Sequence, residues 1–243
     1  MKPVAIVVHH SRTDTRWTEA LLAARGVPAV LLGPYAGELL PDPAALAGVV
    51  CLGGPQDAHG DDREPYLAAE EDFLAAALAA GRPVLGICLG AQLLANVVGG
   101  AAIPGGDGLE CGEIEVTVVA GTDDRVLAGR SGTYFSYHRD SFRLPPGAEL
   151  LATSDRYPQA FRLGTALGIQ FHPEISPEGV AALAAFQHDV LVAAGVDPEE
   201  MVARAHRNRE TAWRSADALI GGWIDHDVRP HATLVPDTPG GPP

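Results

Sequence analysis

The chain has 243 residues, 47% of them hydrophobic, and its 17 basic and 31 acidic side chains give a formal charge of −14. This composition supports one large α/β domain or two small ones with a full core, and the acidic charge argues against a general nucleic-acid-binding surface. Lys2 is the only lysine, which excludes a P-loop or a pyridoxal Schiff base in the interior.

Strand and helix signals alternate through the first half of the chain. Short continuous apolar runs predict strands covered on both faces, at 3–8, 27–32, 47–52 and 83–87. Helical spacing predicts helices at 17–25, 66–81 and 91–100, each ended by glycine. Strands separated by helices imply a parallel sheet with right-handed crossovers.

The second half begins with shorter strand signals split by turns. Strands are predicted at 112–119, 133–138, 149–154, 159–164 and 166–171. A helix is predicted over 176–195, with Ser176 as its N-cap and Pro177 in its first position. A last helix is predicted from Asp197 to about Ile220, followed from Val228 by a tail whose proline and glycine content predicts disorder.

No segment of the sequence indicates a membrane, a disulfide framework or a zinc knuckle. The apolar run near the N-terminus is too short for a signal peptide, and no run reaches the ~18 residues of a membrane span. The three cysteines do not follow the spacing of a metal-binding motif. We therefore expect a cytoplasmic protein with no cofactor, no metal site and no nucleic-acid or membrane partner.

A cysteine stands between two glycines in GICLG, residues 86–90, where a predicted strand meets a predicted helix. This is the setting of a nucleophile elbow, in which a strained turn exposes the central side chain above the sheet. The following helix favours negative charge at Cys88 through its dipole and its free N–H groups. A buried structural cysteine in a tight turn remains the alternative.

Two further segments offer partners for a thiolate at Cys88. In IQFHPE, residues 169–174, His172 and Glu174 are two residues apart, so in an extended chain they point to the same side as a base and its orienter. In LGGP, residues 52–55, glycines after a strand allow a backbone N–H to face a ligand. A surface histidine and an ordinary Gly-Gly-Pro turn are the alternatives.

Other polar groups in the sequence receive structural interpretations. His9 and His10 are adjacent and point to opposite sides of their strand, which disfavours a shared metal ion. Cys51 and Cys111 have no paired base in the sequence and are interpreted as structural.

Together these segments resemble the class I glutamine amidotransferases, in particular a stand-alone glutaminase domain similar to that of GMP synthetase. The resemblance is carried, in the family's order, by LGGP (52–55), PVLGICLGAQLLA (83–95), LANVVGG (94–100), YHRDSFRLP (137–145) and GIQFHPE (168–174). It implies a flavodoxin-like α/β fold, with an open, mostly parallel sheet, helices on both faces and a small antiparallel sheet. We expect this domain to cover 1–195, a helical extension packed on it to cover 196–227 and the tail to cover 228–243.

The resemblance also implies roles for individual residues. Cys88 would attack the side-chain amide of glutamine, His172 would transfer the proton, and Glu174 would orient His172. The backbone N–H groups of Gly54 and Leu89 would form the oxyanion hole.

The amino-acid end of the substrate is expected to meet a second group of residues. These are Gly53, Gln92, Tyr137, His138 and Arg139. The family often has Ser-His-Gly-Asp where this chain has Tyr-His-Arg-Asp, so Arg139 replaces a glycine and puts the identity of the γ-glutamyl substrate in question.

Three functions follow from these interpretations. The first is a glutaminase that supplies ammonia to a separate partner synthase. The second is a stand-alone hydrolase of γ-glutamyl amides or peptides with the same Cys-His-Glu triad. The third is a non-catalytic binding or regulatory module, which is disfavoured because Cys88, His172 and Glu174 are all present.

Overall fold

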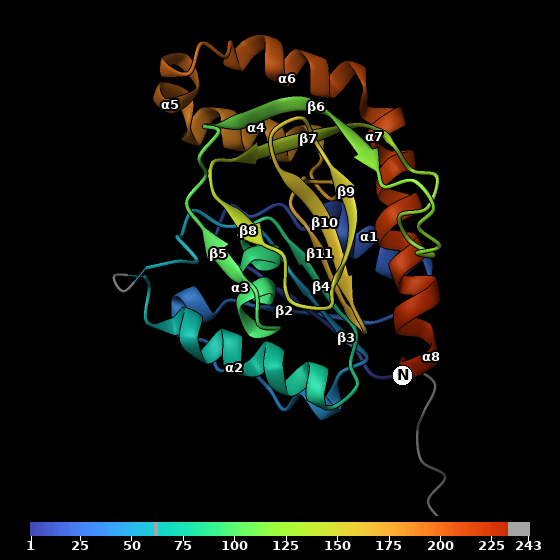
Figure 1. Ribbon diagram of the computed structural model, residues 1–243. Helices are drawn as coiled ribbons and strands as arrows, with labels where there is room; N and C mark the ends of the chain where they lie inside the picture. The colour runs from blue at the N-terminus through green and yellow to red at the C-terminus, as the bar shows by residue number, and fades with distance from the viewer. Residues whose placement is uncertain (61–62, 233–243) are drawn as a thin grey trace, which may run out of the picture.

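The structure is a computed structural model and describes residues 1–60 and 63–232. A nine-stranded sheet has the order β2-β1-β3-β4-β11-β10-β9-β6-β7, and a second sheet pairs β5 with β8 (Figure 1). The strands are β1 (Val4–Val7), β2 (Ala29–Leu32), β3 (Gly48–Cys51), β4 (Val84–Ile87), β5 (Ala101–Ile103), β6 (Glu110–Val118), β7 (Gly132–His138), β8 (Ser141–Arg143), β9 (Glu149–Thr153), β10 (Pro158–Leu163) and β11 (Ala166–Ile169).

The helices connect these strands and then extend the chain beyond the sheet. They are α1 (Arg16–Ala24), α2 (Tyr66–Ala79), α3 (Leu89–Val97), α4 (Pro177–Phe186), α5 (His188–Ala193), α6 (Pro198–Arg207), α7 (Arg209–Ala216) and α8 (Arg229–Ala232). Two π-helical turns, Asp217–Gly221 and Ile224–Val228, lie between α7 and α8.

The first five strands in the sheet order, β2-β1-β3-β4-β11, pair in parallel. This is the 2-1-3-4-5 order of flavodoxin-like folds, and it confirms the predicted class. Every residue of β1, β3, β4 and β11 is buried, because helices cover both faces of this half. The other half, from β10 to β7, is antiparallel.

Alternate residues of the parallel strands enter two separate cores. One core packs α1 and the C-terminal helical segment against side chains such as Val4 and Ile6, and the other packs α2 and α3 against Ala5 and Val7. In Figure 1 α2 lies along the lower left and the C-terminal helices along the right. Helices on both faces therefore leave the ends of the strands as the accessible edge.

The C-terminal segment is fastened to α1 as well as to the sheet. Trp223 and Val228 are fully buried in the core that contains Val4 and Ile6. Arg25 at the end of α1 forms ion pairs with Asp217 at 2.9 Å and Asp225 at 3.0 Å. The first and last helices thus cover the same face of the sheet.

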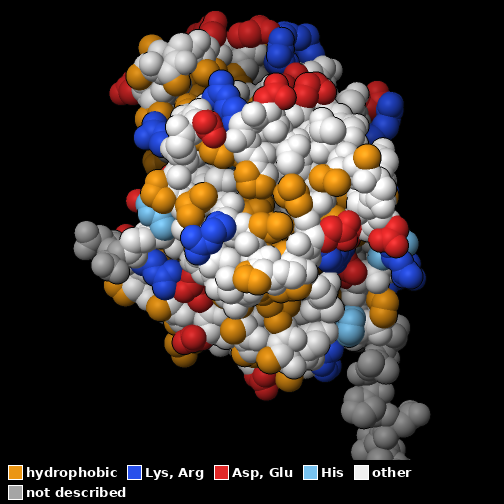
Figure 2. Space-filling view, viewed as in Figure 1, with side chains coloured by type: hydrophobic (Ala, Val, Ile, Leu, Met, Phe, Trp, Pro, Cys, Tyr) orange, Lys and Arg blue, Asp and Glu red, His pale blue; other side chains and the backbone are white. Residues whose placement is uncertain are grey.

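A third cluster joins α4, α5 and α6 above β6 and β7. Its centre is formed by Val180, Leu191 and Met201. On the surface, acidic and basic side chains gather along the edge that α6 forms in this view, whereas the middle of the same face is mostly uncharged (Figure 2). Within the described residues no helix combines the length and apolar character needed to cross a membrane.

Some boundaries differ from the sequence prediction. The helix predicted at 176–195 bends at Gln187 into α4 and α5, which brings Leu191 into the third cluster. The small antiparallel sheet consists of β5 and β8, two three-residue strands that the apolar pattern did not reveal.

The end of the predicted last helix and the start of the predicted tail also differ from the structure. Helical structure continues past Ile220 to Ala232, because Ile224 and Val228 are buried against the sheet. The disorder predicted from Val228 is wrong for 228–232, and the remainder of that tail, 233–243, lies outside the described residues.

Candidate active site

Cys88 occupies a strained turn between β4 and α3. Its backbone has φ 55° and ψ −112°. Among the described residues it is the only non-glycine residue with a positive φ. Such a conformation costs about 1–3 kcal/mol in a non-glycine residue and persists only where its surroundings enforce it. The strain supports the interpretation of GICLG as a nucleophile elbow.

The two glycines around Cys88 are required by space. A Cβ on Gly86 would lie 2.4 Å from the carbonyl oxygen of Gly90, and a Cβ on Gly90 would lie 2.0 Å from that of Cys51. These contacts involve backbone atoms, which cannot move without displacing β3 or α3. The glycines therefore let α3 begin directly against the sheet, with Cys88 projecting from its first turn.

His172 lies just beyond the end of β11 and is held from two directions. Its Nδ1 is 2.7 Å from Oε1 of Glu174, and its backbone N–H donates to the carbonyl oxygen of Phe135 on β7. Burial by itself would lower the pKa of His172, but the negative charges of Glu174 and Cys88 outweigh it and raise the pKa well above its ordinary value. The imidazolium form is therefore favoured at neutral pH.

Cys88 and His172 line one cavity of about 140 Å³, together with Gly53 and Tyr137. A Cβ on Gly53 would lie 3.1 Å from Cε1 of His172 and 3.4 Å from Cβ of Cys88, so the loop after β3 contacts both side chains. The Sγ atom of Cys88 is also 3.9 Å from the carbonyl oxygen of Tyr137. The ends of β3, β4, β7 and β11 thus converge here.

The two residues predicted to supply the oxyanion donors are neighbours, and Gly54 lines the cavity whereas Leu89 is not among its lining residues. A Cβ on Gly54 would be 2.9 Å from Cδ2 of Leu89, so the two residues are neighbours. Across residues 1–60 and 63–232, the backbone N–H groups of Gly54 and Leu89 donate to no protein acceptor. Unpaired N–H groups beside a thiol are the elements that an oxyanion hole needs.

The five predicted substrate contacts separate into two groups. Gly53 and Tyr137 line the cavity with Cys88, whereas Gln92, His138 and Arg139 are not among its lining residues. The amide of Gln92 donates to the carbonyl oxygen of Asp140 and to Oε1 of Gln170, inside the protein. Contact of these residues with a substrate stays a prediction.

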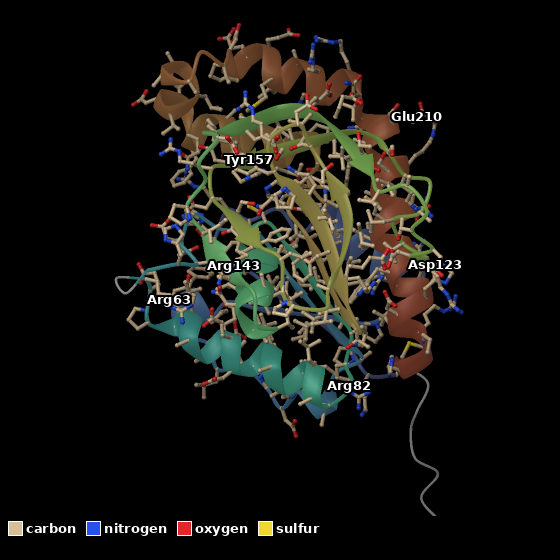
Figure 3. All side chains as sticks on the ribbon, in the orientation of Figure 1. Arg63, Arg82, Asp123, Arg143, Tyr157 and Glu210 are labelled. Atoms are coloured by element: carbon tan, nitrogen blue, oxygen red, sulfur yellow. The ribbon has the colours of Figure 1, made fainter. Side chains whose placement is uncertain are left out.

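His138 and Arg139 take opposite positions at the end of β7. His138 is buried, with Nε2 2.9 Å from Oε2 of Glu110 and Nδ1 2.9 Å from the carbonyl oxygen of Asp140. Its ring also packs edge-on against Tyr157, which Figure 3 labels beside β6 and β7. The side chain of Arg139 is exposed.

Sequence reasoning missed one wall of the cavity, formed by the loop after β1 and by α4. Phe186 on α4 packs near His10, and the guanidinium of Arg12 lies 5.4 Å from the centre of its ring. Asp14 accepts hydrogen bonds from the N–H and hydroxyl of Ser176, which fasten this loop to the start of α4. His9 and His10 were visible in the sequence as a possible site, but the contact between His10 and Phe186 joins residues far apart in the sequence and could not be predicted.

Two groups of side chains are close enough to hold a metal ion. His9, Cys51 and Glu70 form a fully buried group, and Asp57, His59 and Asp140 form a more exposed one, each with ligand atoms within 4.8 Å of one another. Hydrogen bonds engage both groups, including one of 2.9 Å between His59 and Asp140. The absence of a metal site stays a prediction.

The sequence and structure were compared with known proteins. Residues 34–189 match the family described as glutamine amidotransferase class-I. A GMP synthase [glutamine-hydrolyzing] from Thermomicrobium roseum is 35% identical over 190 residues, which cover 74% of this chain and 34% of that protein. A protein of the same name from Xanthomonas axonopodis pv. citri is 34% identical over 165 residues, covering 61% of this chain and 30% of that one. The chain thus spans about a third of the length of these curated relatives.

Solved structures resemble nearly the whole chain. A glutamine amidotransferase from Thermotoga maritima superposes with a TM-score of 0.84 at 28% identity, covering 92% of this chain and 98% of that one. A glutamine amidotransferase from Methylobacillus flagellatus gives 0.84 at 25% identity, covering 93% and 95%. Both likenesses extend over more than nine tenths of this chain.

Proposed function

The chain belongs to the class I glutamine amidotransferase family, and on that premise we propose that it cleaves the side-chain amide of glutamine through a thioester on Cys88. One observation carries this proposal: Cys88, on a strained turn, shares a cavity with His172, which is held by Glu174. The products are glutamate and ammonia. The same arrangement would have no evident purpose in a module that only binds.

The first half of the reaction forms the thioester. The thiolate of Cys88 attacks the amide carbon, and the N–H groups of Gly54 and Leu89 stabilise the oxyanion that forms. The imidazolium of His172 donates its proton to the nitrogen, and collapse of the intermediate breaks the C–N bond and releases ammonia. Glu174 accepts a hydrogen bond from Nδ1 throughout and keeps the ring oriented.

The second half consumes water. Neutral His172 takes a proton from a water molecule as its oxygen attacks the thioester carbon, and the same two N–H groups hold the second oxyanion. Collapse breaks the C–S bond, which restores the thiolate of Cys88 and the imidazolium of His172 and releases glutamate. Gly53 and Tyr137, on the cavity wall, are the substrate contacts best supported by position. Contact of Gln92, His138 and Arg139 with the substrate stays a prediction.

Wild-type protein and Cys88→Ala provide the direct test. We expect the wild type to release glutamate and ammonia from glutamine, and a glutamine-analogue chloroketone to modify Cys88, as located by mass spectrometry. Cys88→Ala should show neither result while keeping the circular dichroism of the wild type. A wild-type protein that leaves Cys88 unmodified and glutamine intact would refute the proposal.

A second candidate is hydrolysis of a larger γ-glutamyl compound with the same residues. One observation favours it: Arg12, together with Leu183 and Phe186 on α4, lines the cavity and offers charge and apolar surface to a leaving group larger than ammonia. A panel of γ-glutamyl amides and peptides, assayed beside glutamine, separates the two. Fast cleavage of a panel member with glutamine at background would replace the first candidate by the second.

We also propose that the ammonia serves a separate partner synthase. The names of the curated relatives support this idea, because they describe synthases that hydrolyse glutamine. A synthase from the same cell should raise the rate of glutamine cleavage when the two proteins are mixed. An unchanged rate, with no ammonia-dependent product, would contradict the pairing.

A further inference from the structure

A histidine–glutamate pair lies buried directly beneath the Gly53–Gly54 loop. Nε2 of His9, at the end of β1, is 2.8 Å from Oε1 of Glu70 on α2, and both side chains are 0% exposed. The thiol of Cys51 donates to the same carboxylate oxygen at 3.1 Å. None of these groups takes part in the reaction described above, so the cost of burying them calls for another role.

His9 holds the glycine loop in three ways. Its Nδ1 is 3.4 Å from the carbonyl oxygen of Gly53, and its own carbonyl oxygen accepts a hydrogen bond of 2.9 Å from the amide of Gln56. A Cβ on Gly54 would lie 2.5 Å from Cβ of His9, so glycine is needed for this close packing. Side chain, backbone and packing all fix the same short segment.

Fixing the carbonyl of Gly53 also fixes the N–H of Gly54. The described residues contain no cis peptide, and in a trans peptide the C=O of one residue and the N–H of the next point in opposite directions. The carbonyl of Gly53 is turned toward His9, and Gly53 itself contacts Cys88 and His172. The N–H of Gly54 is therefore prevented from rotating toward the protein interior.

The protons of the pair follow from the acceptors around it. A carbonyl oxygen only accepts, so Nδ1 of His9 must carry a proton to bond with Gly53. Burial and the charge of Glu70 raise the pKa of Cys51 well above its ordinary value, which keeps its thiol protonated as a second donor to Glu70. Glu70 thus accepts from the thiol of Cys51, and its 2.8 Å contact with Nε2 keeps the ring of His9 aimed at Gly53.

We propose that His9, anchored by Glu70, is a positioning residue that orients the Gly53–Gly54 peptide so that its N–H can stabilise the oxyanion. This inference rests on the proposed function, because it assigns a role in the same reaction. An oxyanion donor acts on the transition state far more than on bound substrate, so its misorientation lowers kcat and leaves KM nearly unchanged.

Two double variants isolate the hydrogen bond to Gly53. His9→Leu/Glu70→Leu removes the pair together and leaves no unpaired buried charge, whereas His9→Asn/Glu70→Leu restores an N–H near the position of Nδ1. We expect kcat to fall about 10- to 100-fold in the first, below the cost of losing a donor outright, with KM within about threefold of wild type. The second should recover most of this loss, and equal kcat values in the two would overturn the proposal.

The rate at which iodoacetamide alkylates Cys88 is the control. This small reagent needs no oxyanion hole, so its rate should be the same in the wild type and both variants. A fall in the variants would mean that the pair supports the thiol itself and would overturn the proposal. A wild-type protein that turns over no γ-glutamyl compound refutes the proposed function, and the inference fails with it.

A measurement on the wild type tests the same point without relying on a variant that folds. In ¹⁵N-histidine NMR, with the resonance assigned by its absence in His9→Asn, we expect a proton on Nδ1 of His9. An Nδ1 without a proton would overturn the proposal, because it could not donate to Gly53.

Discussion

Two of the buried histidine–glutamate pairs at strand ends, His172–Glu174 and His138–Glu110, differ in what the second ring nitrogen meets. In His172–Glu174, beyond β11, Nδ1 is 2.7 Å from the carboxylate, and the ring faces the cavity that contains Cys88. In His138–Glu110, between β7 and β6, the corresponding distance is 2.9 Å, but the other nitrogen bonds to the carbonyl oxygen of Asp140. A paired histidine becomes a candidate base only where one nitrogen remains free beside a reacting group.

The largest difference in activity between the two regions is expected when each histidine is replaced by glutamine. We expect His172→Gln to lower kcat/KM by at least about 10³-fold, because the proposed proton carrier beside Cys88 is lost. His138→Gln should lower it by less than about tenfold, because its effect reaches the site only through the backbone near Tyr137. Steady-state assays of both variants, corrected for folded fraction by circular dichroism, decide the matter. Similar losses in the two variants would contradict the assignment.

Replacing Glu174, the partner of His172, should also lower activity. Glu174→Gln should lower kcat about 10²- to 10⁴-fold, because an amide at this position no longer enforces the required tautomer. The negative charge of Glu174 raises the pKa of His172, so its removal lowers that pKa. The alkaline limb of the pH–rate profile, where the imidazolium is lost, should therefore move to lower pH. An alkaline limb that stays in place would show that Glu174 does not set the charge of His172.

The His138–Glu110 pair is expected to contribute to the stability of the fold, and this contribution should depend on pH. Burial alone would raise the pKa of Glu110, but hydrogen bonds from His138 and Ser154 outweigh it and lower the pKa. A lowered pKa means that Glu110 stabilises the fold above the ordinary pKa of glutamate and loses this contribution as the pH falls through its folded-state pKa. Glu110→Gln should cost about 1–3 kcal/mol of unfolding free energy at pH 7.

Denaturant unfolding across the acid range measures this contribution. The difference between wild type and Glu110→Gln should shrink as the pH falls below about 4. Glu174→Gln, measured in parallel, is the control from the other strand end. If the difference in unfolding free energy between wild type and Glu110→Gln stayed constant to low pH, the charge of Glu110 would not be what stabilises the fold.

The smallest effect concerns the backbone at Cys88. At most sites alanine is more stable than glycine, but the positive φ of Cys88 favours glycine. We expect Cys88→Gly to exceed Cys88→Ala in unfolding free energy by about 1 kcal/mol, with both inactive. Denaturant titrations of the two variants compare them directly. A Cys88→Ala variant more stable than Cys88→Gly would mean that the turn is not strained.

The sequence predicted the parallel strands and the segment around Cys88 because both depend on local patterns. Buried strands read as apolar runs, and a strained turn against a sheet requires glycines at fixed offsets, such as Gly86 and Gly90. The His-Pro-Glu segment is equally local, since His172 and Glu174 are two residues apart. Their proposed roles in the reaction stay predictions that the experiments above address.

Features that depend on distant contacts could not be predicted in this way. The bond between His9 and Glu70 joins residues 61 positions apart, and the cavity wall at Arg12 needs Phe186 from α4. The three-residue strands β5 and β8 are too short to carry a period. The helical continuation to Ala232 depends on burial of Val228, which its proline- and glycine-rich surroundings conceal.

The shared position of the first and last helices has a consequence for synthesis of the chain. Val4 and Ile6 are made first, yet the core that buries them includes Trp223 and Val228, made more than two hundred residues later. A ribosome adding about 5–20 residues per second leaves the part of this core that α1 does not cover open to water for about ten seconds or more. During this interval the apolar side chains that Trp223 and Val228 later contact face water, and docking of the C-terminal helical segment buries them.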